Sequence, residues 1–150
     1  MFCFRLTRHP DLSGEGGRLN AARWHSGGQP ILYTAESDAL AILEVRVNLD
    51  LSFDLLPPEY WMVRIEVDDR WPVEDAALEA RSPEAAAAFG DGWLTESSRG
   101  DRPGVLRVGS VVARFSRNLL LNPQASGFAS AVRVTDVVSF TFDPRLWRGV

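Results

Sequence analysis

The sequence predicts an α+β fold in one domain, and three observations lead to this prediction. The chain has 150 residues, which is the usual size of a single domain with its own core. Alternating apolar residues, typical of strands, dominate both ends, whereas most of the helical pattern lies in the middle. Strands that are segregated from helices along the chain favour an α+β rather than an α/β arrangement.

The first part of the chain is predicted to contain two strands and a helix. Residues 1–7 (MFCFRLT) alternate as in a strand, with Arg5 on the face opposite the phenylalanines. Ser37 is a suitable N-cap for a helix over 38–47, and the helix dipole favours Asp38 in its first turn. Between them we expect a glycine-rich loop, a turn and a strand, at 11–20, 26–30 and 31–35 (ILYTA).

The second part is predicted to be helical at first and then rich in strands. After a connector over 49–60, residues 60–67 (YWMVRIEV) form a strand, with Val63, Ile65 and Val67 on the same face as Trp61. We expect one or two helices and irregular links over 68–104, with a helix near 83–97. The remaining strands are predicted within 104–116, 118–123 and 130–144.

Composition excludes several classes of protein. The net charge of −4 argues against a broad nucleic-acid surface, and no apolar run approaches the ~20 residues of a membrane span. The start of the chain lacks the apolar region of a signal peptide, so we expect a cytoplasmic protein. All 16 basic residues are arginines, which excludes lysine chemistry. No Cys/His pattern predicts a metal site, and the single cysteine, Cys3, is interpreted as a small strand residue.

Glu44 stands on the apolar face of the predicted helix. It lies between Leu40 and Val47, its i−4 and i+3 neighbours. An ionised carboxylate at such a place needs a partner. One interpretation is a structural ion pair with an arginine. The other is a carboxylate held in a cleft, which would act on a developing cation or a sugar hydroxyl.

Other candidate residues flank this helix. Two arginines, Arg5 and Arg23, near one carboxylate fit a bound diphosphate better than a redundant ion pair. Tyr33 could belong to the core or could stack on a planar heterocycle. Ser110 follows a glycine at a bend in a strand region, which alone is a weak signal. His9 and His25 are both interpreted as surface residues.

The sequence resembles the RES-domain toxins, which are named for their arginine, glutamate and serine. The resemblance runs from Arg5 to Leu146, and the matching pieces are FRLT, ARWHSGGQPILYTAES, ALAILEVRV, VGSVVARFSRNLLLNP and FDPRL. The family pattern often has Pro-Ser before the late strand and Asn-Pro-x-His after it. Here these read Gly109-Ser110 and Asn122-Pro123-Gln124-Ala125, so the histidine is missing.

The resemblance implies a single RES-like domain over 1–150, with a fold similar to bacterial ADP-ribosyltransferase toxins: central mixed β-sheets and flanking helices. It implies a toxin that consumes NAD⁺ without a metal, and a helix-turn-helix antitoxin that covers its site. Carried over by position, the catalytic residues are Glu44, Arg23, Tyr33 and Ser110, and those that bind NAD⁺ are Arg5, Arg23, Tyr33 and Ser110.

Several functions remain open at this point. The favoured one is cleavage of the nicotinamide–ribose bond of NAD⁺ by hydrolysis or phosphorolysis, and the alternative is mono-ADP-ribosylation of a specific cellular protein. A module that binds a nucleotide without turning it over, or a purely structural partner, would also be compatible with these residues. The identity of the acceptor and the oligomeric state do not follow from the sequence.

Overall fold

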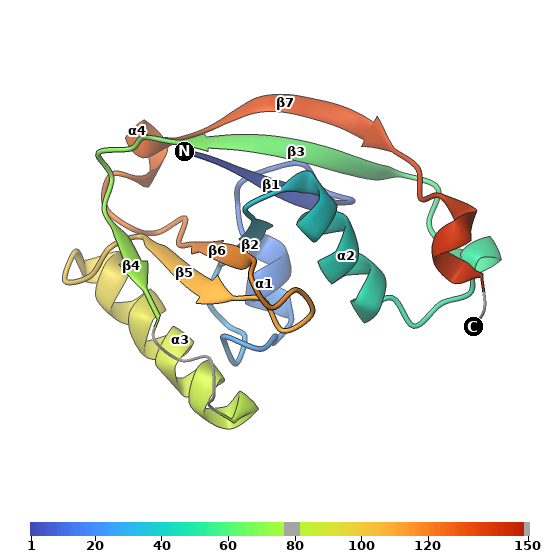
Figure 1. Cartoon of the computed structure of the whole chain (residues 1–150). Coiled ribbons are helices and arrows are strands. Elements are labelled where there is room, and N and C mark those ends of the chain that lie inside the picture. The colour runs from blue at the N-terminus through green and yellow to red at the C-terminus, as the bar shows by residue number, and fades with distance from the viewer. Residues whose placement is uncertain (77–81, 149–150) are drawn as a thin grey trace.

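A mixed sheet of seven strands runs through the part of the molecule that the structure describes (Figure 1). The structure is a computed structural model, and it describes residues 1–76 and 82–148. The strand order is β4-β5-β6-β2-β1-β3-β7, in which β4 and β5 are parallel and all other neighbours are antiparallel. The strands are β1 (Phe2–Thr7), β2 (Leu32–Ala35), β3 (Tyr60–Val67), β4 (Val73–Asp75), β5 (Val105–Gly109), β6 (Arg117–Leu121) and β7 (Val132–Phe140).

Helices and short helical turns connect these strands. The helices are α1 (Glu15–Leu19), α2 (Asp38–Asn48), α3 (Pro83–Arg99) and α4 (Phe128–Ala131), and the 3₁₀ turns are η1 (Phe53–Leu55) and η2 (Pro144–Trp147). The predicted α+β fold with a mixed sheet is therefore confirmed. Within the described ranges, no helix is both long enough and apolar enough to cross a membrane.

Local sequence explains the two long helices. Ser37 caps α2, because its hydroxyl accepts a hydrogen bond from the backbone N–H of Leu40 at 3.2 Å, as predicted. Ser82 caps α3 in the same way, and Pro83 occupies the first turn, where its missing N–H costs nothing. Gly100 ends α3 with φ of 85°, a backbone conformation that glycine adopts without strain.

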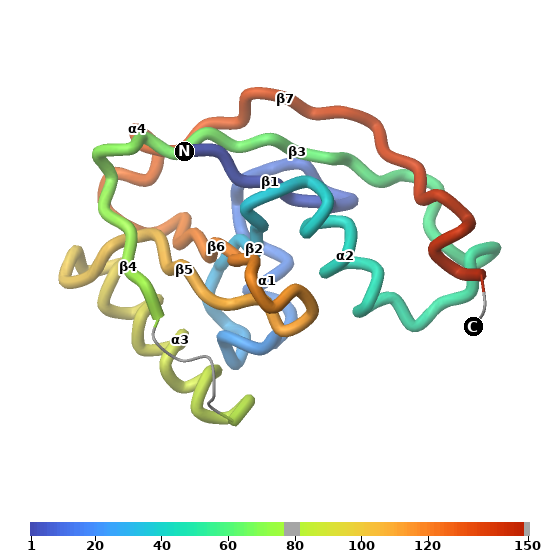
Figure 2. Tube along the Cα trace, viewed as in Figure 1, coloured from blue at the N-terminus to red at the C-terminus, as the bar shows by residue number. Residues whose placement is uncertain are grey.

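The sheet divides between β1 and β2. Strands β1 and β3 pair over six residues, from Phe2 opposite Glu66 to Thr7 opposite Trp61, but β1 and β2 share the single register pair Phe4–Ala35. Figures 1 and 2 show β3 and β7 extending along one side of this division and β5 and β6 along the other. A space can therefore open in the middle of the sheet, beside α2.

Each of the two long helices packs onto the sheet through its own apolar cluster, and a third cluster joins strands on both sides of the division, with Cys3 of β1, Leu32 of β2 and Leu121 of β6 among its members. Helix α2 packs through Leu40 and Ala41 onto residues of β1, β2 and β3, in a cluster that includes Leu6, Ala35 and Tyr60. Helix α3 packs onto β5 and β6, and the members of that cluster include Trp24, Ile31, Trp93, Leu94, Leu106, Val108 and Leu120. The two helices thus hold the borders of the division in place.

The structure corrects several predicted elements. The predicted strands at 1–7, 31–35 and 60–67 are confirmed, and α2 extends one residue beyond the predicted helix over 38–47. The glycine-rich stretch 11–20 contains α1, and 104–116 is not one strand, because β5 ends at Gly109 and residues 110–116 form a loop before β6. The stretch 68–104 holds β4 besides α3, and residues 77–81 of it lie outside the described part.

Candidate active site

A cleft with a volume of about 780 Å³ lies where the sheet divides, and this volume is typical of small-molecule sites. Its walls come from β1, the turn before β2, β2, α2, and β5 and β6 with the loop that connects them. Four of the five residues predicted to act in the site line it: Arg5, Arg23, Tyr33 and Glu44. The fifth, Ser110, does not line the cleft but donates a hydrogen bond to Glu44.

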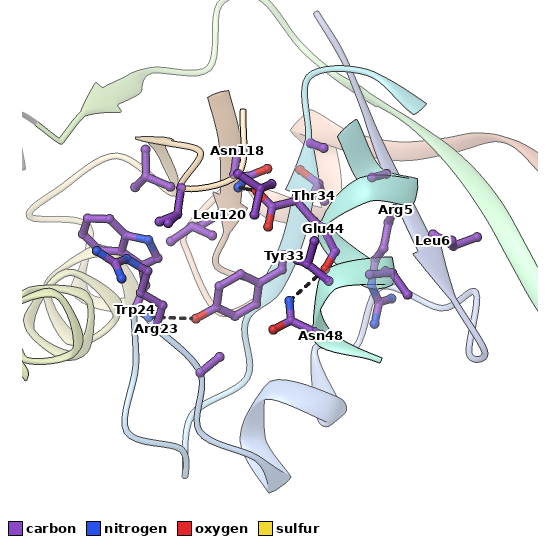
Figure 3. Close-up of a pocket in the computed structure, with 18 of the residues that line it drawn as sticks. Arg5, Leu6, Arg23, Trp24, Tyr33, Thr34, Glu44, Asn48, Asn118 and Leu120 are labelled. Atoms are coloured by element: carbon purple, nitrogen blue, oxygen red, sulfur yellow. Dashed lines mark hydrogen bonds between the residues drawn. The ribbon is translucent and has the colours of Figure 1, made fainter. Parts of the chain in front are cut away.

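Two neutral donors hold the carboxylate of Glu44. The Ser110 hydroxyl donates to Glu44 Oε1 at 2.7 Å, and the Asn118 side-chain amide donates to the same oxygen at 2.6 Å. Asn48, one helical turn further on, donates its side-chain amide to the Glu44 carbonyl oxygen at 2.8 Å (Figure 3). Across the described residues, Glu44 forms no ion pair, so the interpretation as a structural ion pair with an arginine is wrong.

The backbone of the β5–β6 loop fixes the direction of the Ser110 hydroxyl. Ser110 Oγ accepts hydrogen bonds from the backbone N–H groups of Val112 at 3.2 Å and Ala113 at 3.1 Å. Because both donors approach the lone pairs of this oxygen, its own proton is left to point at Glu44 Oε1. Both hydrogen bonds to the carboxylate thus fall on one oxygen, and in the described part of the chain Oε2 accepts none.

Asn118 was not predicted from the sequence. It lies on β6, opposite Ala35 of β2 and Val108 of β5, and it is followed by three buried leucines. Asparagine is disfavoured in a central strand, so a polar amide directly before a buried leucine run was the signal available in the sequence. Its contact with a helix 74 positions away could not be inferred from local pattern.

Arg5 reaches the same cleft as Glu44, a point that the sequence left open. Its Nη1 donates to the carbonyl oxygen of Asp11 at 2.9 Å and to that of His9 at 3.3 Å. Burial lowers the pKa of the Arg5 guanidinium, and the nearby Asp11 carboxylate partly opposes this effect. An arginine remains charged in spite of such a shift, so Arg5 places a half-buried cation in the cleft wall.

Arg23 and Tyr33 form the opposite end of the cleft (Figure 3). Arg23 is exposed, and the adjacent Trp24 is buried. The backbone N–H of Trp24 donates to the Tyr33 hydroxyl at 3.2 Å. Burial raises the pKa of that hydroxyl, which therefore stays protonated at neutral pH. In the view of Figure 3, the Tyr33 ring lies between the Arg23–Trp24 segment and Glu44.

The two histidines and the cysteine differ in their exposure to solvent. His9 is exposed, as predicted, but His25 is 1% exposed, so its interpretation as a surface residue is wrong. Its ring contacts the Tyr33 hydroxyl at 2.9 Å, a long-range relation that a local pattern cannot show. Cys3 is buried, and burial raises the pKa of its thiol to about 11, so it is a packed thiol rather than a nucleophile.

The described residues contain no group of three or more His, Cys, Asp or Glu side chains that could hold a metal ion. The cleft lining contains one carboxylate, two guanidinium groups and three aromatic side chains, one of which is Tyr33. Such a set can bind a polyanion through the arginines, cover a planar group with the Tyr33 ring and stabilise a positive charge with the carboxylate.

Comparisons with a family model and with individual proteins agree on the family to which the chain belongs. The family model described as "RES domain" matches residues 3–143. A protein named "Toxin Res" from Pseudomonas putida is 34% identical, with 98% of this chain and 100% of that protein covered. A "Prs ADP-ribosylating toxin" from a Sphingobium species is 32% identical, over 92% of this chain and 88% of its own length. A "Toxin Res" from Yersinia enterocolitica is 33% identical over 89% of each chain. The match over almost the whole chain, together with these relatives, means that the chain belongs to the RES domain family.

Proposed function

We propose that this chain is a toxin that destroys NAD⁺ by cleaving its nicotinamide–ribose bond and passing ADP-ribose to water or to phosphate. The observation that carries the proposal is the Glu44 carboxylate, which two neutral donors hold in a cleft that also presents Arg5 and Arg23. A fixed anion beside two cations suits a substrate with a diphosphate and a sugar that becomes positive during reaction.

The proposed reaction begins with departure of nicotinamide. The bond between ribose C1′ and the nicotinamide nitrogen breaks, and its electron pair neutralises the positive pyridinium nitrogen. Positive charge then develops on the ribose, as in glycoside cleavage, where a carboxylate stabilises an oxocarbenium-like state. Oxygen of water or phosphate donates a pair to C1′ and forms the new bond, and water gives up its proton to solvent. The products are nicotinamide and either ADP-ribose or its phosphate ester.

Each predicted residue has a place in this scheme. Glu44 Oε2, which accepts no hydrogen bond from the described residues, would face the ribose, whereas Oε1 is occupied by Ser110 and Asn118. Ser110 would then act through Glu44, as a positioning residue, more than through the ribose or the nicotinamide amide. Arg5 and Arg23 would bind the diphosphate, and Tyr33 would stack on nicotinamide.

Mono-ADP-ribosylation of a cellular protein is the second candidate. One relative carries the name "Prs ADP-ribosylating toxin". In addition, the β5–β6 loop exposes apolar side chains beside the cleft: Val111 is 69% exposed and Phe115 is 93% exposed. An apolar loop next to a reactive centre suits the docking of a protein acceptor, which a water- or phosphate-dependent enzyme does not need.

A cognate helix-turn-helix antitoxin is part of the proposal, because relatives named as toxins suggest such a partner. It would prevent access to Arg23 and Glu44 and so stop NAD⁺ consumption in the cytoplasm. The proposal needs no metal, no membrane and no direct contact with nucleic acid. Inhibition by an antitoxin that leaves the whole cleft open would contradict this part of the proposal.

Turnover of NAD⁺ by the purified protein tests the proposed function. The reaction is run with and without phosphate, and the products are identified by mass. Release of nicotinamide together with ADP-ribose or its phosphate would support direct destruction of NAD⁺. Turnover that requires a cell extract, with ADP-ribose appearing on one protein, would favour the second candidate. No reaction in either case would reject both.

Replacement of Arg23 should weaken NAD⁺ binding more than it slows the reaction. A charge-assisted hydrogen bond contributes about 1.5–3 kcal/mol, so we expect Arg23→Gln to raise KM about tenfold or more with kcat little changed. Arg114→Gln is the matched control, because Arg114 is an exposed arginine on the β5–β6 loop that does not line the cleft. Equal effects of the two substitutions on KM in steady-state kinetics would remove Arg23 from the substrate site.

Asn118 offers a test of how Glu44 is held. Asn118→Ala removes one donor to Oε1 and should lower kcat about tenfold, the scale of one hydrogen bond to a charged group. Asn118→Asp places a second carboxylate at this contact, and at neutral pH it should lower kcat further by repulsion. At low pH the new carboxylate and that of Glu44 can share a proton, which restores a hydrogen bond between residues 118 and 44. The kcat of Asn118→Asp should therefore rise toward low pH relative to that of Asn118→Ala. Parallel profiles would contradict this role.

A further inference from the structure

His25 is a buried polar residue that the proposed reaction does not use. It is 1% exposed, and both of its ring nitrogens have partners. Nε2 lies 2.6 Å from the carbonyl oxygen of Gly17, and Nδ1 lies 2.9 Å from the Tyr33 hydroxyl. Two polar contacts on a side chain this deeply buried define one orientation of the ring.

The partners of His25 determine its tautomer. The Gly17 carbonyl oxygen can only accept, so Nε2 carries the proton and donates. In the neutral ring Nδ1 is then an acceptor, and the Tyr33 hydroxyl donates to it. The same hydroxyl accepts the backbone N–H of Trp24. The Tyr33 hydroxyl is thus held from two sides, and the direction of its proton is fixed.

The backbone of His25 also shapes the turn that carries Arg23. Ala22 and His25 exchange backbone hydrogen bonds at 3.1 and 3.3 Å, which closes a tight turn with Arg23 and Trp24 at its tip. Behind this turn, the N–H of Ser26 donates to an Asp91 carboxylate oxygen of α3 at 2.9 Å. His25 therefore connects two parts of the cleft wall. Its backbone closes the turn that carries Arg23, and its ring contacts the Tyr33 hydroxyl.

We propose that His25 is a positioning residue of the cleft: through its Nδ1 acceptor it holds the Tyr33 ring against the Arg23 turn, where the ring covers the planar group of the substrate. The proposal rests on the proposed function, since it assigns Tyr33 to the wall that contacts nicotinamide. His25 itself does not line the cleft. Its contribution is to hold the Tyr33 ring in the position that stacking requires. Misplacement of a contacting group by about 1 Å can reduce the efficiency of an enzyme up to ~100-fold.

A pair of amide substitutions separates the two contacts of the ring. In His25→Asn the side-chain oxygen can take the position of Nδ1, so it retains an acceptor for Tyr33 and loses the donor to Gly17. In His25→Gln the side-chain amide can reach the position of Nε2, so it retains the donor to Gly17 and loses the acceptor for Tyr33. Both variants place one neutral amide at position 25, so a difference between them does not come from a difference in the polarity of the side chain.

Steady-state kinetics with NAD⁺ should distinguish the variants. A stacking contact made equally in ground and transition states affects KM more than kcat. We expect His25→Asn to keep KM within about threefold of the parent, and His25→Gln to raise it about tenfold or more with kcat little changed. In a Tyr33→Phe background, which lacks the hydroxyl, His25→Gln should add little to the change in KM. The reverse order, equal values of KM, or full additivity in the double variant would overturn the proposal.

A measurement that does not require turnover keeps this inference separate from the proposed function. In the ¹⁵N-labelled free protein, His25 should show a proton on Nε2 and an acceptor-type Nδ1, and Tyr33→Phe should shift the Nδ1 resonance. If the parent does not consume NAD⁺ but these signals appear, the proposed function fails and the His25–Tyr33 contact stands. A proton on Nδ1 would reject its role as the acceptor for Tyr33, and an Nδ1 resonance that Tyr33→Phe does not change would reject the contact itself.

Discussion

Glu44→Gln is expected to abolish at least about 99% of NAD⁺ turnover while the protein remains folded. The amide keeps an oxygen that can accept from Ser110 and Asn118, so the contacts that hold residue 44 can persist. It lacks the negative charge that stabilises the developing cation on the ribose. Loss of a key electrostatic group in an active site costs about 100- to 1,000-fold in kcat. The loss should therefore appear in kcat, with KM for NAD⁺ little changed.

Glu36→Gln provides the control for this experiment. Glu36 is exposed, lies one residue after β2 and does not line the cleft. Its substitution removes one negative charge from the same region and should leave kcat unchanged. Circular dichroism and thermal unfolding would establish that both variants are folded. A folded Glu44→Gln protein that retains parental turnover would reject the proposed mechanism.

Gly90→Ala is expected to cause a large loss of stability, although it adds only one methyl group. A Cβ at this position of α3 would lie 1.6 Å from the carbonyl oxygen of Trp24, which is backbone and cannot rotate away. Overpacking of a well-packed interior costs about 1–3 kcal/mol, and a clash with backbone belongs at the upper end. For a chain of this size, ~3 kcal/mol corresponds to a decrease in Tm of roughly 6–12 °C. The Arg23–Trp24 segment should also move, which would raise KM for NAD⁺.

Gly92→Ala, two residues further along the same helix, is the matched control. Apart from the adjacent residues and the backbone of α3 itself, no atom of the described residues lies within 4 Å of a Cβ built there. Alanine is the better helix former by ~1 kcal/mol, so this substitution should leave the free energy of unfolding unchanged or raise it slightly. Chemical denaturation of both variants with the parent measures the difference directly. Equal stabilities of the two variants would show that α3 does not press against the Trp24 backbone as described.

Much of the cleft could be predicted because its residues are close in sequence. Arg23, Tyr33 and Glu44 fall within 22 residues, on a turn, a strand and a helix that local patterns identify. The helical period alone placed Glu44 on the face that α2 turns toward the sheet, one turn after the buried Leu40. Ser110 took its role from the family resemblance, Arg5 was also a candidate for binding a diphosphate on its residue type, and the structure brings both to the same region.

The parts that were missed depend on contacts between distant segments. Asn118 meets Glu44 only because β6 pairs with β2, and no local pattern sets that pairing. His25 was interpreted as a surface residue, but its ring contacts the carbonyl oxygen of Gly17 in α1 and the hydroxyl of Tyr33, neither of which a local pattern shows. The parallel strand β4 is three residues long, too short for alternation to be visible in the sequence.

A crystal structure of the Glu44→Gln protein with NAD⁺ bound is the measurement that tests the central claim most directly. The substitution should preserve the cleft and keep the substrate intact for data collection. We expect the nicotinamide ring against Tyr33, its ribose against residue 44, and the diphosphate between Arg5 and Arg23. NAD⁺ bound elsewhere on the molecule, or in the cleft with its nicotinamide ribose remote from residue 44, would contradict the account.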